Sequence, residues 1–475
     1  MSPGALFTDF YELTMAQGYH RNAMNRRVVF DMFFRRNPFS GGFSLCAGLE
    51  PLLEAIETFT FSGEDLAYLE SQRVFGSSFL EYLETFRFGG DVYAVPEGTV
   101  VFPNAPMLRV EASLIEAQLI EGLLLNIVNF QTLIATKTAR IYLASNRGKI
   151  LEFGLRRAQG IDGALSATRA AFIGGAAATS NTLAGQRLGI PVSGTMAHSW
   201  VMAFDSELEA FEAYAELYPD KAILLVDTYD TLRSGTQNAV IVGKKLAARG
   251  QAIGVRLDSG DIQYLSHAIR RQLDENGLTD ATIAVSNELN EEIIHQLVSD
   301  GCPVNFWGVG TQLVTGGSDS ALTGVYKLAA KERNGEMIPT MKVSDNPEKT
   351  TDPGIKQVYR LYDPDGSPIA DIVALADEEI VAGRRYVFHH PAIDYRRFSI
   401  VPEGEIRPLL EPVMRDGRVT RQAPSLTEIA ERTKSEIGAL DPTYTRLINP
   451  HIYKVSITDR LKELKSEMVR QIVDW

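Results

Sequence analysis

The sequence predicts an α/β protein centred on an irregular (β/α) barrel. From Lys149 to about Ala330, short apolar segments of strand type alternate with amphipathic segments of helical period. This alternation implies parallel strands joined by crossover helices, and about six to eight strands favour a barrel over an open sheet. Different patterns precede and follow this region, which indicates α+β structure before it and a strand-rich extension with helices after it.

The N-terminal segment is expected to be an α+β domain that ends in a long linking helix. Residues 8–15 (TDFYELTM) contain a capping box, with Thr8 or Asp9 as the cap and Glu12 near the third helical position. The other elements expected here are a strand, two helices, a short meander and the long helix, over residues 28–35, 48–59, 63–84, 91–111 and 114–143.

The barrel segment supplies the strand and helix candidates of the catalytic domain. The strand candidates are residues 150–153, 176–179, 192–193, 222–226, 252–257, 282–285, 304–309 and 325–328. Helices are expected between most of them, for example over 231–249, 262–276 and 291–299. Two of the crossovers are short, so we expect the barrel to be irregular.

The C-terminal segment is predicted to be rich in strands. Hairpin turns are expected at 363–366 (DPDG) and 416–417 (DG), and a loop over 344–356. A capping box at 425–428 begins a helix, and a last helix covers 458–472. The predicted domains are therefore residues 1–145, 146–335 and 336–475.

Composition narrows the possible functions. The chain has 475 residues, 45% hydrophobic and 23% charged, as in ordinary soluble globular proteins. A formal net charge of -13 argues against binding to nucleic acid or to anionic membranes. The most apolar stretch, residues 122–136, is too short to span a bilayer. Two cysteines without a CxxC motif, and no basic N-terminal segment, indicate a reducing compartment, the cytoplasm.

A histidine at a strand-to-helix junction is the first candidate for the reactive residue. Residues 194–200 (GTMAHSW) follow a short strand candidate and precede a helical pattern. The small or hydroxylic neighbours of His198 leave a ring nitrogen accessible, and a neutral imidazole is nucleophilic. The alternative is a loop histidine that only hydrogen-bonds its neighbours.

Polar residues collect at the predicted carboxyl ends of the strands. In a parallel barrel these ends share one face, so residues distant in sequence can converge there. The residues at these ends are Glu152, Phe153, Arg156, Thr179, Asn181, Thr195, His198, Asp227, Asp230, Arg256, Asp258, Asp261, Gly308, Gly310 and Thr311. This set predicts a site for a phosphorylated, metal-chelated substrate, because it contains one nucleophile, two arginines, several carboxylates and a glycine-rich turn.

Two runs indicate how an anionic substrate could be held. Glycines 308 and 310 would let backbone N–H groups approach a phosphate, although the run GVGT could also be an ordinary tight turn. Arg256 can grip a carboxylate in a bidentate fork, while Asp258 suits ribose hydroxyls or Mg2+. A structural ion pair between Arg256 and the two nearby carboxylates is the alternative for this run.

Residues 223–230 (ILLVDTYD) require a separate interpretation. Apolar residues followed by acids resemble the diphosphate-sugar motif of type I phosphoribosyltransferases. The second adjacent acid of that motif is replaced here by Thr228, so the match to that class is weak. Asp227 is instead interpreted as a strand-end carboxylate that can bind a metal ion.

Taken together, the motifs resemble the nicotinate phosphoribosyltransferase family, a branch of the type II phosphoribosyltransferases. The matching runs extend from the N-terminus almost to the C-terminus: residues 8–15, 126–137 (NIVNFQTLIATK), 152–157 (EFGLRR), 179–185 (TSNTLAG), 194–198, 255–261, 308–315 and 449–453 (NPHIY). The resemblance implies condensation of nicotinate with phosphoribosyl diphosphate to nicotinate mononucleotide and diphosphate, in NAD salvage and coupled to ATP hydrolysis with Mg2+.

The resemblance also implies that the segments after the barrel pack back on the N-terminal α+β domain, and it implies roles for individual residues. His198 matches a histidine that ATP phosphorylates transiently, and Tyr11 and Phe153 match rings on the two faces of the pyridine. Tyr11 would come from the second subunit of a homodimer. Thr195 and Arg256 match contacts to the nicotinate carboxylate. Arg156, Asp258, Gly310 and Thr311 match groups around the phosphoribosyl moiety. From their positions at the strand ends, Asp261 and Gly308 are expected beside them, and Asp227 and Asp258 are expected to bind the metal ion.

Asn181 bears on the choice between acid and amide substrates. Related nicotinamide enzymes have an aspartate at this position, which would accept an amide N–H and repel nicotinate. The neutral Asn181 therefore favours nicotinate. The alternatives are nicotinamide or quinolinate phosphoribosyl transfer, a barrel aldolase or isomerase acting on another phosphosugar with Glu152 as its base, and a non-catalytic nucleotide sensor.

Overall fold

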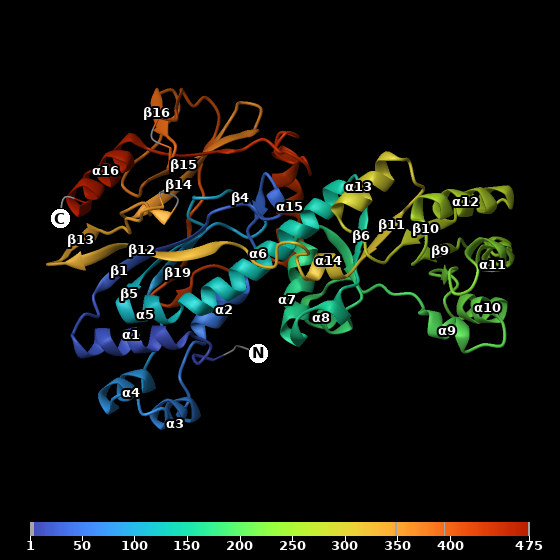
Figure 1. The fold of residues 1–475 in the computed structure, drawn as a ribbon, viewed down its shortest axis with the longest axis horizontal. Helices are drawn as coiled ribbons and strands as arrows, with labels where there is room; N and C mark the ends of the chain where they lie inside the picture. Colours follow the sequence, from blue (N-terminus) through green and yellow to red (C-terminus); the bar gives the residue numbers. More distant parts are fainter. Residues whose placement is uncertain (1–3, 347–348, 394, 474–475) are drawn as a thin grey trace. The chain divides into compact units, whose positions relative to one another are not determined.

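The computed structural model describes residues 4–346, 349–393 and 395–473, and these form two compact units (Figure 1). One unit spans Met1–Leu133 and Ala321–Trp475, and the other spans Ile134–Ser320. Among the described residues, none of the helices combines the length and apolar character needed to cross a bilayer. The predicted α/β class is confirmed.

The second unit is built on a parallel sheet. Its strands are β6 (Lys149–Glu152), β7 (Ala176–Thr179), β8 (Ile223–Leu225), β9 (Gly254–Leu257), β10 (Thr282–Val285) and β11 (Phe306–Val309). The spatial order is β7-β6-β11-β10-β9-β8, and every pairing is parallel. Crossovers through helices explain why the strands run the same way.

The strands of this unit are ordered as in a barrel, with one gap in the pairing that we call the seam. Val192 forms an isolated parallel bridge with Thr179 at the outer edge of β7. Read from β8 through β9, β10, β11, β6 and β7 to Val192, the order is a cyclic permutation of the chain order, as in a barrel. Among the described residues, no pairing joins Val192 to β8, so the segment after Val192 lies at the seam.

Helices follow most of these strands, as the sequence predicts. They are α7 (Gly160–Ile173), α8 (Thr182–Leu188), α9 (His198–Met202), α10 (Glu207–Leu217), α11 (Thr236–Ala247), α12 (Ile262–Glu275), α13 (Glu291–Ser299) and α14 (Thr311–Val314). Short helical turns cover Leu155–Arg157 and Thr231–Gly235. Side chains of Asn181, Ser206, Asp261 and Asn290 cap α8, α10, α12 and α13.

The first unit contains two larger sheets and a two-stranded ladder. The larger sheets have the orders β13-β12-β1-β5-β3-β19-β20 and β17-β16-β21-β15-β14-β18, and the ladder pairs β2 with β4. Their bounds are β1 (Arg27–Phe34), β2 (Ser44–Leu45), β3 (Asp91–Ala94), β4 (Val100–Val101), β5 (Leu108–Ser113), β12 (Gly324–Arg333), β13 (Glu336–Pro339), β14 (Lys356–Tyr362), β15 (Pro368–Leu375), β16 (Tyr386–His389), β17 (Arg397–Ile400), β18 (Ile406–Pro408), β19 (Glu411–Arg415), β20 (Arg418–Val419) and β21 (Lys454–Ile457).

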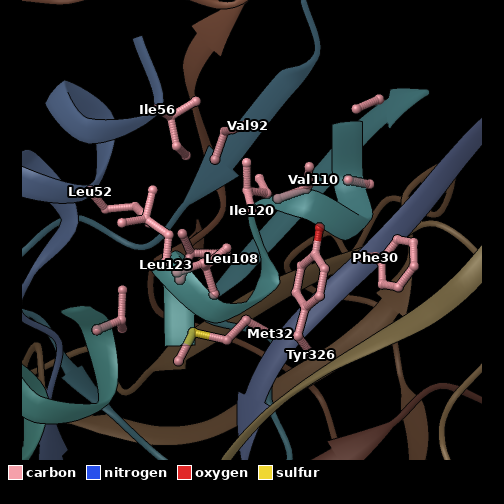
Figure 2. Packing of buried hydrophobic residues seen from close by; sticks show 14 of the residues in the cluster. Phe30, Met32, Leu52, Ile56, Val92, Leu108, Val110, Ile120, Leu123 and Tyr326 are labelled. Atoms are coloured by element: carbon pink, nitrogen blue, oxygen red, sulfur yellow. The ribbon is translucent and has the colours of Figure 1, made fainter. Parts of the chain in front are cut away.

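Helices cover these sheets and fill the core between them. They are α1 (Phe10–Arg21), α2 (Leu49–Glu57), α3 (Gly63–Ser71), α4 (Ser77–Glu84), α5 (Leu114–Leu119), α15 (Leu426–Ala439), α16 (Asp459–Val473) and the first part of α6 (Glu121–Ala144), which continues into the second unit after Leu133. Figure 2 shows Leu52 and Ile56 of α2 with Val92, Leu108 and Leu123 in this core. The ring of Phe30 on β1 stacks on Tyr326 of β12, with centroids 4.6 Å apart.

Several expected elements differ in the structure. Residues 325–328 are a strand, but β12 pairs antiparallel with β1 in the first unit, so assigning this segment to the barrel was wrong. The long helix is broken at Ile120 into α5 and α6, and the helix expected over 63–84 is divided into α3 and α4. The meander also differs, because β3 pairs with β5 while β4 pairs with β2.

The local signals for turns and caps are confirmed. Residues 363–366 connect β14 to β15, and residues 416–417 connect β19 to β20. Capping boxes begin α1 at Asp9 and α15 at Ser425. Part of the loop expected over 344–356 falls on residues 347 and 348, outside the described residues.

Candidate active site

The candidate site lies where the parallel strands of the second unit end. Glu152, Thr179 and Leu257 are the last residues of β6, β7 and β9, and most of the other site residues predicted in this unit lie a few residues after these and the other strands. Since all pairings are parallel, these ends lie at one edge of the sheet. The structure links most of the predicted residues there through side-chain contacts.

His198 begins α9 and is held beside two carboxylates. Its side chain is 40% exposed, and its Nδ1 lies 3.1 Å from the hydroxyl of Thr228. Its Nε2 lies 3.8 Å from Oδ2 of Asp258 and 4.0 Å from Oδ1 of Asp227. The imidazole is therefore oriented on one side by a hydroxyl and remains open to a ligand.

Asp227 is fixed by the neighbouring strand end. Its side chain is 1% exposed, and its Oδ2 accepts hydrogen bonds from the backbone N–H of Asp258 at 2.9 Å and from the hydroxyl of Ser259 at 2.6 Å. Its buried Oδ1 has no hydrogen-bond partner within the described part of the chain. This oxygen faces His198, so an incoming cation or a protonated imidazole would satisfy it.

Asp258 is braced from the next strand. The hydroxyl of Ser286, which follows β10, donates to Oδ1 of Asp258. The second oxygen of Asp258 is left directed at His198. Two carboxylates, each with one oxygen engaged by the protein, thus present their other oxygen to the same imidazole.

Arg256 has a largely buried guanidinium group, and not all of its N–H donors are hydrogen-bonded. Its Nη1 donates to the hydroxyl of Thr195, and its buried Nε has no partner among the residues that the structure describes. Burial lowers the pKa of Arg256, with Arg156 contributing, while Asp258 and Asp227 oppose the shift. An anion that reached Nε would gain a charge-assisted hydrogen bond and would relieve the burial of an unpaired donor.

Gly308 in β11 and Gly310 directly after it pack closely against the segment after β6. A Cβ on Gly308 would lie 2.8 Å from the ring of Phe153, and a Cβ on Gly310 would lie 3.2 Å from the Phe153 carbonyl oxygen. The backbone N–H of Phe153 also donates to the Val309 carbonyl at 2.9 Å. The aromatic residue and the glycine-rich turn are therefore one packed assembly, with Thr311 starting α14 beside it.

Glu152 and Asn181 are buried in a hydrogen-bonded brace. The Glu152 carboxylate accepts from the backbone N–H of Gly154 and from the hydroxyls of Thr168 and Thr179. The Asn181 side chain accepts from the N–H of Ala184 at 3.2 Å and donates to the hydroxyl of Thr168 at 3.3 Å. The Glu152 side chain therefore ties β6, α7 and β7 together, and the Asn181 side chain ties α7 to the start of α8.

Other predicted residues are placed as follows. Asp261 caps α12 by accepting from the N–H of Tyr264 at 2.9 Å, and Asp230 caps the turn at Thr231–Gly235. Arg156 is exposed in the short helical turn after β6. Tyr11 lies on α1 in the first unit, where its ring is 48% exposed.

Sequence reasoning missed the hydroxyl groups that position the site. Thr228 was noted only as a departure from a motif, and Ser259 and Ser286 were not considered. Their signal was present, because Ser286 directly follows an apolar strand candidate as the other site residues do. Within the described residues there is no group of three or more His, Cys, Asp or Glu side chains able to hold a metal ion by themselves.

A basic cavity in the first unit was also missed. It has a volume of about 440 Å3, and its lining includes the cationic residues Arg35, Arg36, Lys327, Lys356 and Lys465. Lys356 forms a buried ion pair of 2.7 Å with Asp31. These cationic residues come from distant segments of the chain, so no local sequence motif predicted the cavity.

The chain matches known proteins over nearly its whole length. Residues 6–129, 148–392 and 355–465 match the sequence profiles of the nicotinate phosphoribosyltransferase (NAPRTase) N-terminal domain, family and C-terminal domain. The nicotinate phosphoribosyltransferase of Bacillus subtilis is 44% identical over 478 residues, covering 98% of this chain and 97% of that protein. One from Mycobacterium tuberculosis is 41% identical over 460 residues, covering 96% and 92%.

Solved structures have the same fold. The crystal structure of human nicotinic acid phosphoribosyltransferase matches with a TM-score of 0.83 and 32% identity, covering 97% of this chain and 99% of that one. Nicotinate-nucleotide pyrophosphorylase from Pyrococcus furiosus shares the fold, with a TM-score of 0.71. The chain is therefore a phosphoribosyltransferase. Within this class it belongs to the nicotinate phosphoribosyltransferase family.

The brace around Glu152 gives a stability prediction. Replacing Glu152 with Ala leaves the N–H of Gly154 and two threonine hydroxyls without their buried acceptor. We expect a loss of about 2–5 kcal/mol in the free energy of unfolding, measured by urea denaturation. Glu152→Gln retains an acceptor and should lose clearly less. An alanine variant as stable as the wild type would contradict the bracing role.

Proposed function

We propose that the protein condenses nicotinate with phosphoribosyl diphosphate to give nicotinate mononucleotide and diphosphate, in NAD salvage. The pyridine nitrogen forms a bond to the anomeric carbon of the ribose while the bond to the diphosphate oxygen breaks. The diphosphate leaves with the bonding electron pair. No general base is needed for nicotinate, so positioning and charge stabilisation carry the catalysis.

The arrangement of Arg256 and Thr195 is the observation that best supports this substrate. A buried guanidinium with an unused Nε, fixed by a hydroxyl, suits a carboxylate on a small planar ligand. A neutral amide would offer Nε an uncharged acceptor, which binds a guanidinium less strongly than a carboxylate does. The acid is therefore preferred over nicotinamide.

Aromatic residues would sandwich the pyridine ring. Phe153 is packed against Gly308 at the strand ends, which supports a fixed stacking surface in the second unit. Tyr11 would supply the other face from a second copy of the chain in a homodimer. The exposure of Tyr11 and of its neighbour Phe10 on α1 supports an interface there.

His198 would accept a phosphoryl group from ATP. In this step a bond forms between an imidazole nitrogen and the γ-phosphorus, ADP leaves, and water later releases inorganic phosphate from the imidazole. The phosphorylated histidine would change the affinity for the diphosphate-bearing ligands and would form no bond with the sugar. Support comes from the half-exposed ring held by Thr228.

Mg2+ would be held mainly by the phosphates of the substrates. Asp227 and Asp258 each have one free oxygen near His198, which fits a cation that takes one or two carboxylates and completes its shell with phosphate oxygens and water. The metal would neutralise charge on the departing diphosphate. Arg156, Asp258, Asp261, Gly308, Gly310 and Thr311 would surround the phosphoribosyl group, with Asp261 doing so from its capping position.

A barrel aldolase or isomerase is less well supported. Such an enzyme needs an accessible base, and Glu152 is buried and accepts three hydrogen bonds. A non-catalytic sensor would not need the pair of carboxylates directed at an accessible imidazole. Pyridine phosphoribosyl transfer would use both the accessible imidazole and the two carboxylates beside it.

An assay with three pyridines tests the function. Purified protein is supplied with phosphoribosyl diphosphate, ATP and Mg2+, and with nicotinate, nicotinamide or quinolinate. We expect nicotinate mononucleotide as the main product, detected by chromatography. Faster turnover of nicotinamide or quinolinate would reject the proposed substrate.

Replacing His198 with Ala tests the role of ATP. We expect the variant to keep a basal transfer reaction that ATP no longer accelerates, because the phosphoryl acceptor is lost. Turnover is measured with and without ATP. His295→Ala, which removes an exposed histidine of α13, is the matched control and should keep the ATP response. ATP acceleration of the His198 variant would show that another group is phosphorylated.

Asn181→Asp tests discrimination between acid and amide. A carboxylate in this buried place repels nicotinate, so the ratio of kcat/KM for nicotinate over nicotinamide should fall by about tenfold or more. Asn290→Asp is the control, because Asn290 also caps a helix of the same unit through its side-chain oxygen. An unchanged ratio in a folded Asn181 variant would leave the residue only its capping role.

A further inference from the structure

Two hydrogen-bonded paths lead from Asn181 to the carboxylate of Glu152. In the first, Nδ2 of Asn181 donates to the hydroxyl of Thr168 at 3.3 Å, and that hydroxyl donates to Oε2 of Glu152 at 3.0 Å. In the second, the backbone N–H of Asn181 donates at 2.9 Å to the hydroxyl of Thr179, which donates to the same carboxylate oxygen. Each of these four residues is at most 3% exposed, so water competes little for their polar groups.

The direction of the first path is fixed by the other partners of Thr168. A hydroxyl has one proton to donate. The Thr168 hydroxyl faces the carboxylate of Glu152 and, at 2.9 Å, the carbonyl oxygen of Ala164, and both of these groups only accept. Thr168 therefore gives its proton to one of them and needs a donor from residue 181.

The amide of Asn181 has one orientation that satisfies both of its neighbours. The backbone N–H of Ala184 needs an acceptor, which is Oδ1 of Asn181 at 3.2 Å, so Nδ2 is the atom that faces Thr168. The amide oxygen thus caps α8, and among the residues that the structure describes only one of the two N–H groups of Nδ2 is used. An aspartate at this position would have no donor and would compete with Glu152 for the single proton of Thr168.

We propose that Thr168 is a positioning residue that fixes the amide of Asn181 as a hydrogen-bond donor and thereby sets the preference for an acid over an amide pyridine. The inference deepens the proposed function and rests on it. The remaining N–H of Asn181 suits the carboxylate of nicotinate, whereas the N–H groups of nicotinamide need an acceptor. Specificity therefore depends on two buried side chains, Thr168 and Glu152, as well as on residue 181.

Thr168→Val tests the positioning role, because it removes the hydroxyl and keeps the shape of the side chain. The amide of Asn181 then loses the acceptor for Nδ2 and can rotate, so the ratio of kcat/KM for nicotinate over nicotinamide should fall by about tenfold. Thr168→Ser keeps the hydroxyl and should restore the ratio. An unchanged ratio in a folded Thr168→Val variant overturns the proposal.

Thr138→Val is the matched control for this substitution. Thr138 is a fully buried threonine of the same unit, and its hydroxyl donates to the carbonyl four residues earlier, as that of Thr168 does. The ratio of kcat/KM for the two pyridines should stay at the wild-type value in this variant. A fall as large as that of Thr168→Val would show a general effect of losing a buried hydroxyl and would overturn the proposal.

A double-mutant cycle on unfolding tests the direction of the path without an activity assay. Asn181→Asp sets two carboxylates against one hydroxyl proton, so it should lower the urea concentration at the midpoint of unfolding. Glu152→Gln turns an NH2 group toward Thr168, because the oxygen of the new amide is needed by the N–H of Gly154. The Thr168 hydroxyl can then donate to a carboxylate at position 181.

Asn181→Asp should therefore lower the midpoint less in the Glu152→Gln background than in the wild type. Equal decreases in the two backgrounds would mean that the path has no fixed direction, and they overturn the proposal. A wild type that makes no nicotinate mononucleotide rejects the proposed function, while the coupling between the two positions still reports on the hydrogen-bonded path.

Discussion

The hydrogen bond from the backbone N–H of Asp258 to the carboxylate of Asp227 connects the ends of β8 and β9, and the geometry around His198 depends on it. It occupies one oxygen of a buried carboxylate and leaves the other directed at the imidazole. Ser286 does the same for Asp258 from the end of β10. The residues that follow three neighbouring strands therefore hold two carboxylates beside one imidazole ring.

The sequence was sufficient to assemble the candidate site because the carboxyl ends of parallel strands must share an edge. The strand-end argument placed His198, Asp227, Arg256 and Asp258 at one edge, and contacts now join His198 to Asp227 and Asp258 and join Arg256 to Thr195. The hydroxyl partners could not be chosen from sequence, because which oxygen of a carboxylate is engaged depends on side-chain geometry. The basic cavity of the first unit could not be predicted from the sequence either, because its cationic residues come together only in the tertiary structure.

Element types were predicted better than their pairings. Turn and cap signals are local, so the hairpins at 363–366 and 416–417 and the cap at Ser425 followed from a few residues each. The strand at 325–328 has the same apolar character as a barrel strand, and only its antiparallel partner β1 distinguishes it. The break at Ile120 was hidden because the apolar spacing continues through it.

The pairing of β1 with β12 also sets an order of events during synthesis. Phe30 pairs with Leu328. During synthesis, one edge of β1 therefore has no partner strand until almost three hundred further residues have been added. The intervening unit is continuous in the chain and can complete its own sheet as it leaves the ribosome. Until β12 arrives, a hydrophobic strand edge stays open to mispairing with other nascent chains. Assembly of the first unit therefore ends the aggregation-prone phase of biogenesis.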